Sequence, residues 1–291
     1  MKTTPASLLV FCFLFFLPFC SFSSDTLRVM TFNIRYDKPD DSIYAWSQRR
    51  DMVLRVIRNH KPDIFGIQEG LENQLNDLQS GLTGYQWKGI GRDDGNHKGE
   101  FAAVFYRSEI LEAIEDSTFW LSQTPRLPGS ISWGAACTRI VTWVKFRDRE
   151  CGTIFYLFNT HFDHMSEQAR LESARLLKQQ VMRIAGKYPA IITGDFNDTR
   201  TSVMYQELVN PVNSLFSFKD ARDLAPLGTL EPQYSYVGFP FNPEKGSLVD
   251  HIFIRPFHNV HVSSYHVLTD HEGNLYPSDH LPILIDVIIK Q

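Results

Sequence analysis

The most constraining feature of this sequence is a recurring pattern in which an apolar, strand-like stretch ends in a reactive polar side chain. A strand buries its apolar residues and delivers its last polar group to one rim of a sheet, where a rigid scaffold commonly carries function. Six such placements are hard to explain by stability alone and predict one shared site. They are Asn33, Gln68-Glu69, Asn159-Thr160-His161, Asp195 with Asn197, Asp250-His251 and Asp279-His280.

Composition excludes several classes of protein. Of 291 residues, 43% are hydrophobic and 21% charged, which is near the globular average and argues against disorder, collagen-like repeats and coiled coil. The formal net charge is −4, whereas proteins that coat long nucleic acid are usually basic. Tight non-specific binding to such polymers is therefore disfavoured, although a local basic cleft is compatible with this charge.

The start of the chain differs from the rest. Lys2 precedes the apolar run 8–19, and the small residues Ser21, Ser23 and Ser24 follow it, which is the pattern of a secretory signal peptide. A membrane-spanning helix needs about 20 apolar residues, more than this run provides. We expect a signal peptide at 1–24 and a secreted, extracytoplasmic protein; the alternative is a membrane anchor formed by the uncleaved segment.

The remainder, 26–291, is predicted to be one domain, because no repeat, low-complexity segment or linker interrupts it. Helices are expected at 46–60, 71–82 and 166–185, the last capped by Ser166. Strands are expected at 27–32, 64–68, 85–90, 101–106, 113–120, 138–146, 153–159, 191–193, 251–255, 261–268 and 283–289. Residues 198–247 are expected to be loops. Interposed helices and frequent hairpins favour α/β layers around mixed or antiparallel sheets.

Cysteine usage indicates no disulfide framework. Only Cys137 and Cys151 follow residue 25, and they flank a predicted strand whose length exceeds the reach of a disulfide. We expect both to be thiols.

The residue types at the six polar ends indicate the chemistry. They are carboxylates, amides and histidines, without a Gly-x-Ser-x-Gly nucleophile or a Cys near a His motif. Oxygen donors of this kind suit Mg²⁺ or Mn²⁺ rather than a structural Zn²⁺. Glu69 is the first expected ligand, with Asp279 or Asp195 as the second.

Such a set can hydrolyse a phosphoester. A divalent ion, a charged histidine and amide donors neutralise the charge that develops on phosphoryl oxygens. Asp195 can accept or orient the proton of the attacking water. A histidine of the set that is bonded to a carboxylate would stay positive more readily, because a nearby carboxylate favours the charged imidazole.

The same motifs, in the same order, resemble the endonuclease/exonuclease/phosphatase superfamily, and the resemblance runs from residue 31 to 280. It is carried by Thr31-Phe32-Asn33-Ile34-Arg35, Gln68-Glu69, Asn159-Thr160-His161, Gly194-Asp195-Phe196-Asn197, Asp250-His251-Ile252-Phe253 and Ser278-Asp279-His280. It implies a four-layer α/β sandwich, with two mixed or antiparallel sheets face to face and helices outside. It also implies metal-dependent phosphoester hydrolysis.

The resemblance further implies roles for individual residues. Asn33, Glu69 and Asp279 match the family's metal-binding end of the site. The catalytic set it implies is His161 for phosphate contact, Asp195 and Asn197 for the attacking water, and Asp250 orienting His280. On looser spacing, Arg139 resembles a phosphate-binding arginine of the deoxyribonuclease branch, and Glu100 resembles the acid that supports the first histidine there.

Structural alternatives stay open for several of these residues. Asp195 and Asn197 could form an Asx-capped turn, Arg139 could be a surface strand residue and Glu100 could be solvated. Arg35, Arg92, Lys98 and His164 are open between phosphate contact and the surface. The Asn197-Asp198-Thr199 sequon is interpreted as accidental, and His251 as structural. For the aromatic residues Tyr234, Tyr236, Phe239 and Phe241, loop packing is favoured slightly over base stacking.

The function expected from all of this is a secreted, Mg²⁺-dependent phosphodiester hydrolase, nuclease-like and acting on RNA or DNA ends, for example as a 3′–5′ RNA exonuclease. A phosphatase or sphingomyelinase-type enzyme acting on a small or lipid phosphoester is the alternative, and a catalytically dead binding module is a third hypothesis. The expected partner is a phosphoester substrate. The protein is expected to be a monomer without a stable protein partner.

Overall fold

The computed structural model describes residues 26–210, 217–226, 232–255 and 260–289. The expected signal peptide at 1–24 lies outside these residues. Within them, no helix combines the length and the apolar character that crossing a membrane requires.

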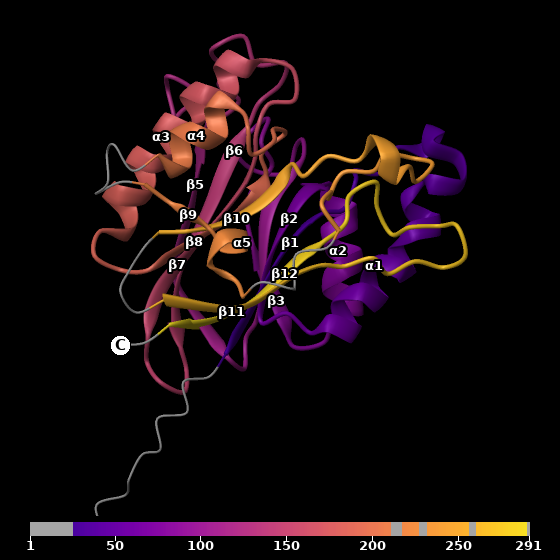
Figure 1. Ribbon diagram of the computed structural model, residues 1–291, viewed down its shortest axis with the longest axis horizontal. Helices are drawn as coiled ribbons and strands as arrows, with labels where there is room; N and C mark the ends of the chain where they lie inside the picture. The colour runs from indigo at the N-terminus through magenta and orange to yellow at the C-terminus, as the bar shows by residue number, and fades with distance from the viewer. Residues whose placement is uncertain (1–25, 211–216, 227–231, 256–259, 290–291) are drawn as a thin grey trace, which may run out of the picture.

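Two six-stranded sheets pack face to face at the centre of the protein (Figure 1). The first contains, in spatial order, β11 (Val260–Val267), β12 (Ile283–Ile289), β1 (Leu27–Asn33), β2 (Ile64–Gly70), β4 (Phe101–Arg107) and β3 (Tyr85–Lys88). The second contains β5 (Leu111–Trp120), β6 (Ile140–Asp148), β7 (Ile154–His161), β8 (Ala190–Asp195), β10 (Asp250–Ile254) and β9 (Lys219–Asp220). Both sheets are mixed, since β1 runs parallel to β2 and β7 parallel to β8 while the other pairs are antiparallel.

Helices cover the outer faces of both sheets, with α3 and α4 on the left and α1 and α2 on the right in Figure 1. Their bounds are α1 (Trp46–His60), α2 (Glu72–Gly81), α3 (Glu167–Ala185) and α4 (Val203–Val209). Shorter elements are η1 (Pro39–Tyr44), α5 (Ala221–Leu224) and η3 (Pro243–Lys245). The predicted four-layer α/β sandwich is therefore confirmed.

The long helices form for the reasons that the sequence indicated. Ser166 Oγ accepts the N–H of Ala169 at 3.1 Å, which caps α3. The face of α3 that carries Ala174, Leu177 and Val181 is buried against the second sheet. Helix α1 spans 46–60 as predicted, and its core-facing Val53, Val56 and Ile57 are buried against the first sheet.

Between the sheets, the apolar core gives way to a buried amide bridge. Asn159 Nδ2, on β7, donates to Ile67 O at 2.7 Å and Ala103 O at 2.9 Å in the opposite sheet. Gln68 Nε2 donates back to Asn159 Oδ1 at 2.6 Å. Glycine is required opposite this amide, since a Cβ on Gly66 would lie 2.2 Å from Asn159 Oδ1. Because Asn159 and Gln68 are fully buried, their hydrogen bonds to each other and to the opposite sheet fix how far one sheet is shifted along the other.

Two local predictions differ from the structure. The strand expected at 138–146 is β6, Ile140–Asp148, although its predicted hairpin with β7 is confirmed. Within 198–247, expected to be loops, Ser202 Oγ caps α4 by accepting the N–H of Tyr205 at 3.1 Å. Helix α4 has only seven residues, too few for a helical period to stand out. Cys137 is a thiol without a disulfide, as expected.

Candidate active site

The pairing of neighbouring strands in each sheet brings the predicted polar residues to one end of the sandwich. In the second sheet, Asp195 lies opposite both His161 of β7 and Asp250 of β10. In the first sheet, Asn33 at the end of β1 lies opposite Gln68 of β2. Because the two sheets stack, residues from both can meet across the gap between them.

Asn33 is the residue that joins the two halves of the site. Its Nδ2 donates to Asp195 Oδ2 at 2.9 Å and to Glu69 Oε1 at 3.1 Å. The same nitrogen lies 3.5 Å from His280 Nε2. Asn33 is fully buried, so its amide holds carboxylates of both sheets in one cluster.

Glu69 has an unusual backbone that aims its carboxylate. Its φ is +62°, in the left-handed region that non-glycine residues rarely adopt and that often marks functional positions. The second carboxylate oxygen accepts the N–H of Tyr36 at 3.1 Å. Both oxygens of Glu69 are thus oriented by donors from the segment at and after the end of β1.

His161 is a neutral imidazole whose tautomer can be assigned. Asn197 Nδ2 donates to Phe162 O at 3.0 Å, which fixes the orientation of the amide because a carbonyl oxygen can only accept. The same Nδ2 lies 2.9 Å from His161 Nε2, so Nε2 accepts and the proton resides on Nδ1. Burial first, and the charges of Arg139 and Arg92 next, hold the pKa of His161 well below its ordinary value.

His280 is in the opposite state. Burial alone would lower its pKa, but the carboxylates of Asp250 and Asp195 outweigh this and raise it well above the ordinary value. Its Nδ1 lies 2.8 Å from Asp250 Oδ2, and its Nε2 lies 3.7 Å from Asp195 Oδ2. His280 is therefore an imidazolium oriented by Asp250, with its second N–H towards the cluster.

Asp195 lies between these two histidines, with Oδ2 3.4 Å from His161 Nε2. Burial raises its pKa to about 7, and the charge of Asp250 adds to this effect. Asp279, which is also buried, has a raised pKa because of burial and because of the charge of Glu69. Among the described residues, hydrogen bonds join the Asp279 carboxylate only to the hydroxyl of Ser278.

The donor set fits a divalent cation. Ligand atoms of Glu69, His161 and Asp195 all lie within 4.8 Å of one another, as do those of Asp195, Asp250 and His280. Buried carboxylates that repel each other and resist ionisation gain most from a cation between them. Carboxylate and amide oxygens are the ligands that Mg²⁺ and Mn²⁺ prefer. Glu69 and Asp195 are thus placed to share such an ion. The predicted ligand Asn33 instead turns its Nδ2 to these two carboxylates, while its Oδ1 accepts the N–H of Arg35 at 2.9 Å. The metal-binding role of Asp279 stays a prediction.

Glu100 and Arg139 flank His161 and are not surface residues. Arg92 holds Glu100 through two hydrogen bonds of 2.6 and 2.9 Å, and a Glu100 oxygen lies 3.9 Å from His161 Nδ1. Arg139 is 5% exposed, so its interpretation as a surface strand residue is wrong. Within the described chain, its Nε and Nη1 are buried without a hydrogen-bond partner, although Nε lies 3.9 Å from Asp163 Oδ2; Nη1 is thus a donor left for an anion.

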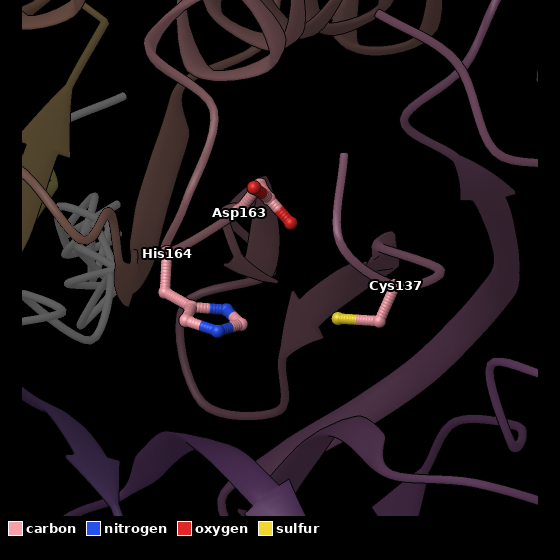
Figure 2. A group of neighbouring side chains, drawn as sticks. All are labelled: Cys137, Asp163 and His164. Atoms are coloured by element: carbon pink, nitrogen blue, oxygen red, sulfur yellow. The ribbon is translucent and has the colours of Figure 1, made fainter. Parts of the chain in front are cut away.

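Beside Arg139, Figure 2 shows a further cluster of Cys137, Asp163 and His164, whose potential ligand atoms lie within 4.8 Å of one another. Arg139 Nη2 lies 3.0 Å from His164 Nδ1; because guanidinium can only donate, that ring nitrogen is occupied as an acceptor. Burial would raise the pKa of Asp163, but backbone N–H groups of residues 136, 165 and 166 lower it. The Asp163 carboxylate therefore holds together the loops around residues 136 and 165–166. Because the positively charged Arg139 guanidinium already contacts His164, this cluster does not suit a metal ion.

The open alternatives divide between site and scaffold. Arg92 contacts Glu100, a carboxylate at the site, and Arg35 contacts Asp41 in η1. The backbone N–H of Lys98 instead closes a turn by donating to Asp94 Oδ1. His251 is buried and contacts the carbonyl of Asp198, so it is structural as expected.

The four aromatic residues between 234 and 241 likewise differ in whether they pack in the fold or lie at the site. Tyr234 and Phe241 pack against the core, and the ring of Phe239 stacks on that of Tyr44 at 4.4 Å. Tyr236 instead is 41% exposed, with its ring centroid 4.9 Å from that of His280. The sequence contained no signal that would separate Tyr236 from its neighbours, nor one for the Tyr36 N–H that orients Glu69.

A family model described as the endonuclease/exonuclease/phosphatase family matches residues 30–280. The chain belongs to this family. Members of the family are phosphoester hydrolases that use divalent metals, which agrees with the cluster at the strand ends. The matched range contains all the residues of the candidate site, from Asn33 to His280.

Solved structures of family members agree in fold. The endonuclease/exonuclease/phosphatase from Bacteroides vulgatus is 39% identical with a TM-score of 0.84, covering 91% of this chain and 100% of that one. A Bacteroides thetaiotaomicron mannosyl-6-phosphatase is 34% identical with a TM-score of 0.82, covering 90% of this chain and 100% of that one. An uncharacterised protein of Acanthamoeba polyphaga mimivirus is 27% identical, over 84% of this chain and 92% of its own length.

Proposed function

We propose that this protein is a Mg²⁺- or Mn²⁺-dependent hydrolase of small phosphate esters, with sugar phosphomonoesters as the first substrate class. The observation that supports catalysis most directly is the placement of Asp195 between a neutral His161 and a charged His280. Titratable groups whose surroundings push their pKa values apart are characteristic of acid–base sites.

In the proposed reaction, water attacks phosphorus and the ester P–O bond breaks. Asp195, whose pKa is near 7, accepts the proton of the attacking water. The charged His280 donates its Nε2 proton to the ester oxygen as the P–O bond breaks, so that the leaving group departs as an alcohol, and Asp250 holds the ring in place. Asn197 orients His161 so that its Nδ1–H is directed to the Glu100 side of the site.

The cation would be held by Glu69 and Asp279 beside Asp195, while Asn33 Nδ2 would keep the carboxylates of Glu69 and Asp195 in place. When bound, it would supply positive charge against the phosphoryl oxygens. Arg139, whose Nε and Nη1 have no hydrogen-bond partner in the described part of the chain, would add further donors to the bound phosphate.

Three observations favour a small substrate. The formal net charge is −4. Two arginines beside the site are paired with carboxylates, Arg92 with Glu100 and Arg35 with Asp41. A 34% identical structure is described as a mannosyl-6-phosphatase. A long polyanion, by contrast, is usually held by unpaired basic side chains.

Nuclease activity on RNA or DNA ends is the second candidate. It is favoured by the exposed ring of Tyr236 next to His280, because base stacking on an aromatic ring contributes about 1–3 kcal/mol per base. A sphingomyelinase-type activity has no comparable support among the described residues.

A substrate panel tests the proposal. Purified protein would be assayed with Mg²⁺, Mn²⁺ or EDTA on mannose 6-phosphate, glucose 6-phosphate, single-stranded RNA and DNA, and sphingomyelin. We expect inorganic phosphate from the hexose phosphates and none in EDTA. Nucleotides as the main product would replace the first candidate with the second. Specific binding without turnover of any phosphoester would indicate a binding module.

Export and a monomeric state are also part of the proposal. Export is supported by the signal-like residues 1–24, whereas the monomeric state stays a prediction. Cell fractionation with N-terminal sequencing would distinguish a cleaved, secreted protein from one anchored by its N-terminal segment. Light scattering on the purified protein would give its oligomeric state.

A further inference from the structure

A buried arginine lies beneath the loops that carry the candidate site. Arg49 is on α1, in the outer helical layer, yet it is only 1% exposed. Its guanidinium donates to four backbone carbonyls and to no carboxylate among the described residues. Their oxygens are those of Ile34 at 2.7 Å, Pro277 at 2.7 Å, Arg35 at 3.1 Å and Tyr44 at 2.5 Å.

These carbonyls flank residues of the site from both sides of the chain. Ile34 and Arg35 directly follow Asn33, and Pro277 precedes Asp279 by two residues. A single nitrogen, Arg49 Nη1, bonds both Ile34 O and Pro277 O. One atom of Arg49 therefore bonds both the loop after β1 and the loop before His280, which lie more than 200 residues apart in the sequence. Ser278 Oγ also joins these loops by donating to Asn33 O at 2.7 Å.

The loop after β1 needs such support because its backbone is strained. Arg35 has a φ of +56°, which costs free energy in a residue other than glycine. Its carbonyl accepts from Arg49 and also from Gln74 Nε2 at 3.0 Å. The conformation it stabilises directs the N–H of Arg35 to Asn33 Oδ1 at 2.9 Å and the N–H of Tyr36 to Glu69.

The chemistry of the side chain suits this task. Burial lowers the pKa of Arg49 to about 10, so the guanidinium is still charged at neutral pH. Its planar fork of five N–H groups can reach several carbonyls at once, whereas the ammonium group of lysine is a single point on a flexible stem.

We propose that Arg49 is a positioning residue for catalysis: it fixes Asn33 and His280 relative to Asp195 by clamping the loops that carry them. It touches neither the substrate nor the metal. This inference rests on the proposed function, in that it concerns the phosphoester hydrolysis attributed to that site.

The test compares Arg49→Met and Arg49→Lys with Arg50→Met. Arg50 is the adjacent residue, exposed and paired only with Asp51 in the described structure, so it serves as a matched control. We expect Arg49→Met to lower kcat by about 100-fold, since a misplacement of about 1 Å can cost that much. KM should change less than about threefold. Arg49→Lys should recover part of kcat, and Arg50→Met should match the wild type.

The melting temperature separates positioning from general destabilisation. A kcat deficit that persists at temperatures where each variant is fully folded supports the proposal. A folded Arg49 variant with kcat within about twofold of wild type, or a deficit that tracks the unfolded fraction, overturns it. If Arg49→Met does not fold, Arg49→Lys is judged by the same criteria.

Mn²⁺ binding, followed by electron paramagnetic resonance, provides a readout that does not need turnover. We expect affinity to fall about tenfold in Arg49→Met and to be unchanged in Arg50→Met. If the wild type hydrolysed no phosphoester, the proposed function would fail, and Mn²⁺ affinity alone would then decide the role of Arg49: equal affinity in both variants would refute it.

Discussion

The turns that follow β8 and β6 share one side-chain hydrogen bond and have different surroundings. Each strand ends in an aspartate, Asp195 or Asp148, whose Oδ1 accepts the backbone N–H two residues later, at 2.9 and 2.8 Å respectively. Asp148 lies in an open hairpin turn, half-buried. Asp195 is 1% exposed and lies within 4 Å of ring nitrogens of two histidines.

The comparison shows that one carboxylate can both close an Asx turn and belong to the candidate site. The structural alternative for Asp195 is correct as far as the backbone is concerned, and the same side chain uses its second oxygen for Asn33. What distinguishes Asp195 is the burial and the neighbours contributed by the opposite sheet. Substitutions at the two turns should therefore have opposite effects on activity and stability.

The largest expected effect is on catalysis at the β8 turn. Asp195→Asn should lower kcat by about 10²–10⁴, the usual contribution of a general base. Its melting temperature should stay equal or rise, because the amide removes a buried charge. Steady-state kinetics and thermal melts would check this, with Asp148→Asn as the control that keeps wild-type kcat. Wild-type activity in Asp195→Asn would contradict the role assigned to this carboxylate.

The next effect concerns the cation. Glu69→Gln keeps the shape of the side chain but removes its charge, so the Mg²⁺ concentration for half-maximal activity should rise at least tenfold, the range seen when groups supporting a metal site are changed. Titrating Mg²⁺ into EDTA-treated protein measures this. An equal Mg²⁺ requirement in wild type and variant would exclude Glu69 as a ligand.

A subtler effect is expected on pH dependence. The charged form of His280 is the active one, and the carboxylates of Asp250 and Asp195 raise its pKa, so activity should fall as pH rises through that raised pKa. In Asp250→Asn the pKa falls, and the alkaline limb of the kcat profile should move to lower pH. A limb at the wild-type position would show that another group titrates there.

The smallest effect is expected at the β6 turn. Asp148→Ala removes hydrogen bonds from the N–H groups of Glu150 and Cys151, each worth about 0.5–1.5 kcal/mol. The melting temperature should fall by several degrees, at about 2–4 °C per kcal/mol for a domain of this size. kcat should be unchanged; a loss of activity would mean that the two ends of the sandwich are coupled.

Sequence patterns predicted what is local and missed what is tertiary. Apolar alternation located the long strands and α1, because burial on one face leaves a period in the sequence. The seven residues of α4 are too few to show one. The residues that meet at the candidate site could be predicted because their motifs occur in a known order, and their catalytic roles stay predictions. Arg49 could not, since an arginine inside an amphipathic helix normally indicates a solvent-exposed face.

The amide bridge through Asn159 has a consequence for how such a protein can be altered. Sliding one sheet along the other by a single residue would break the three buried hydrogen bonds that Asn159 makes to the opposite sheet. In the present alignment, Asn159 fits only because the residue opposite it, Gly66, has no Cβ. Halves taken from two different homologues would therefore need matching residues at this seam. Chimaeras that combine sheets from two homologues without these matching residues should still bury their apolar residues but should not form the site at the end of the sandwich.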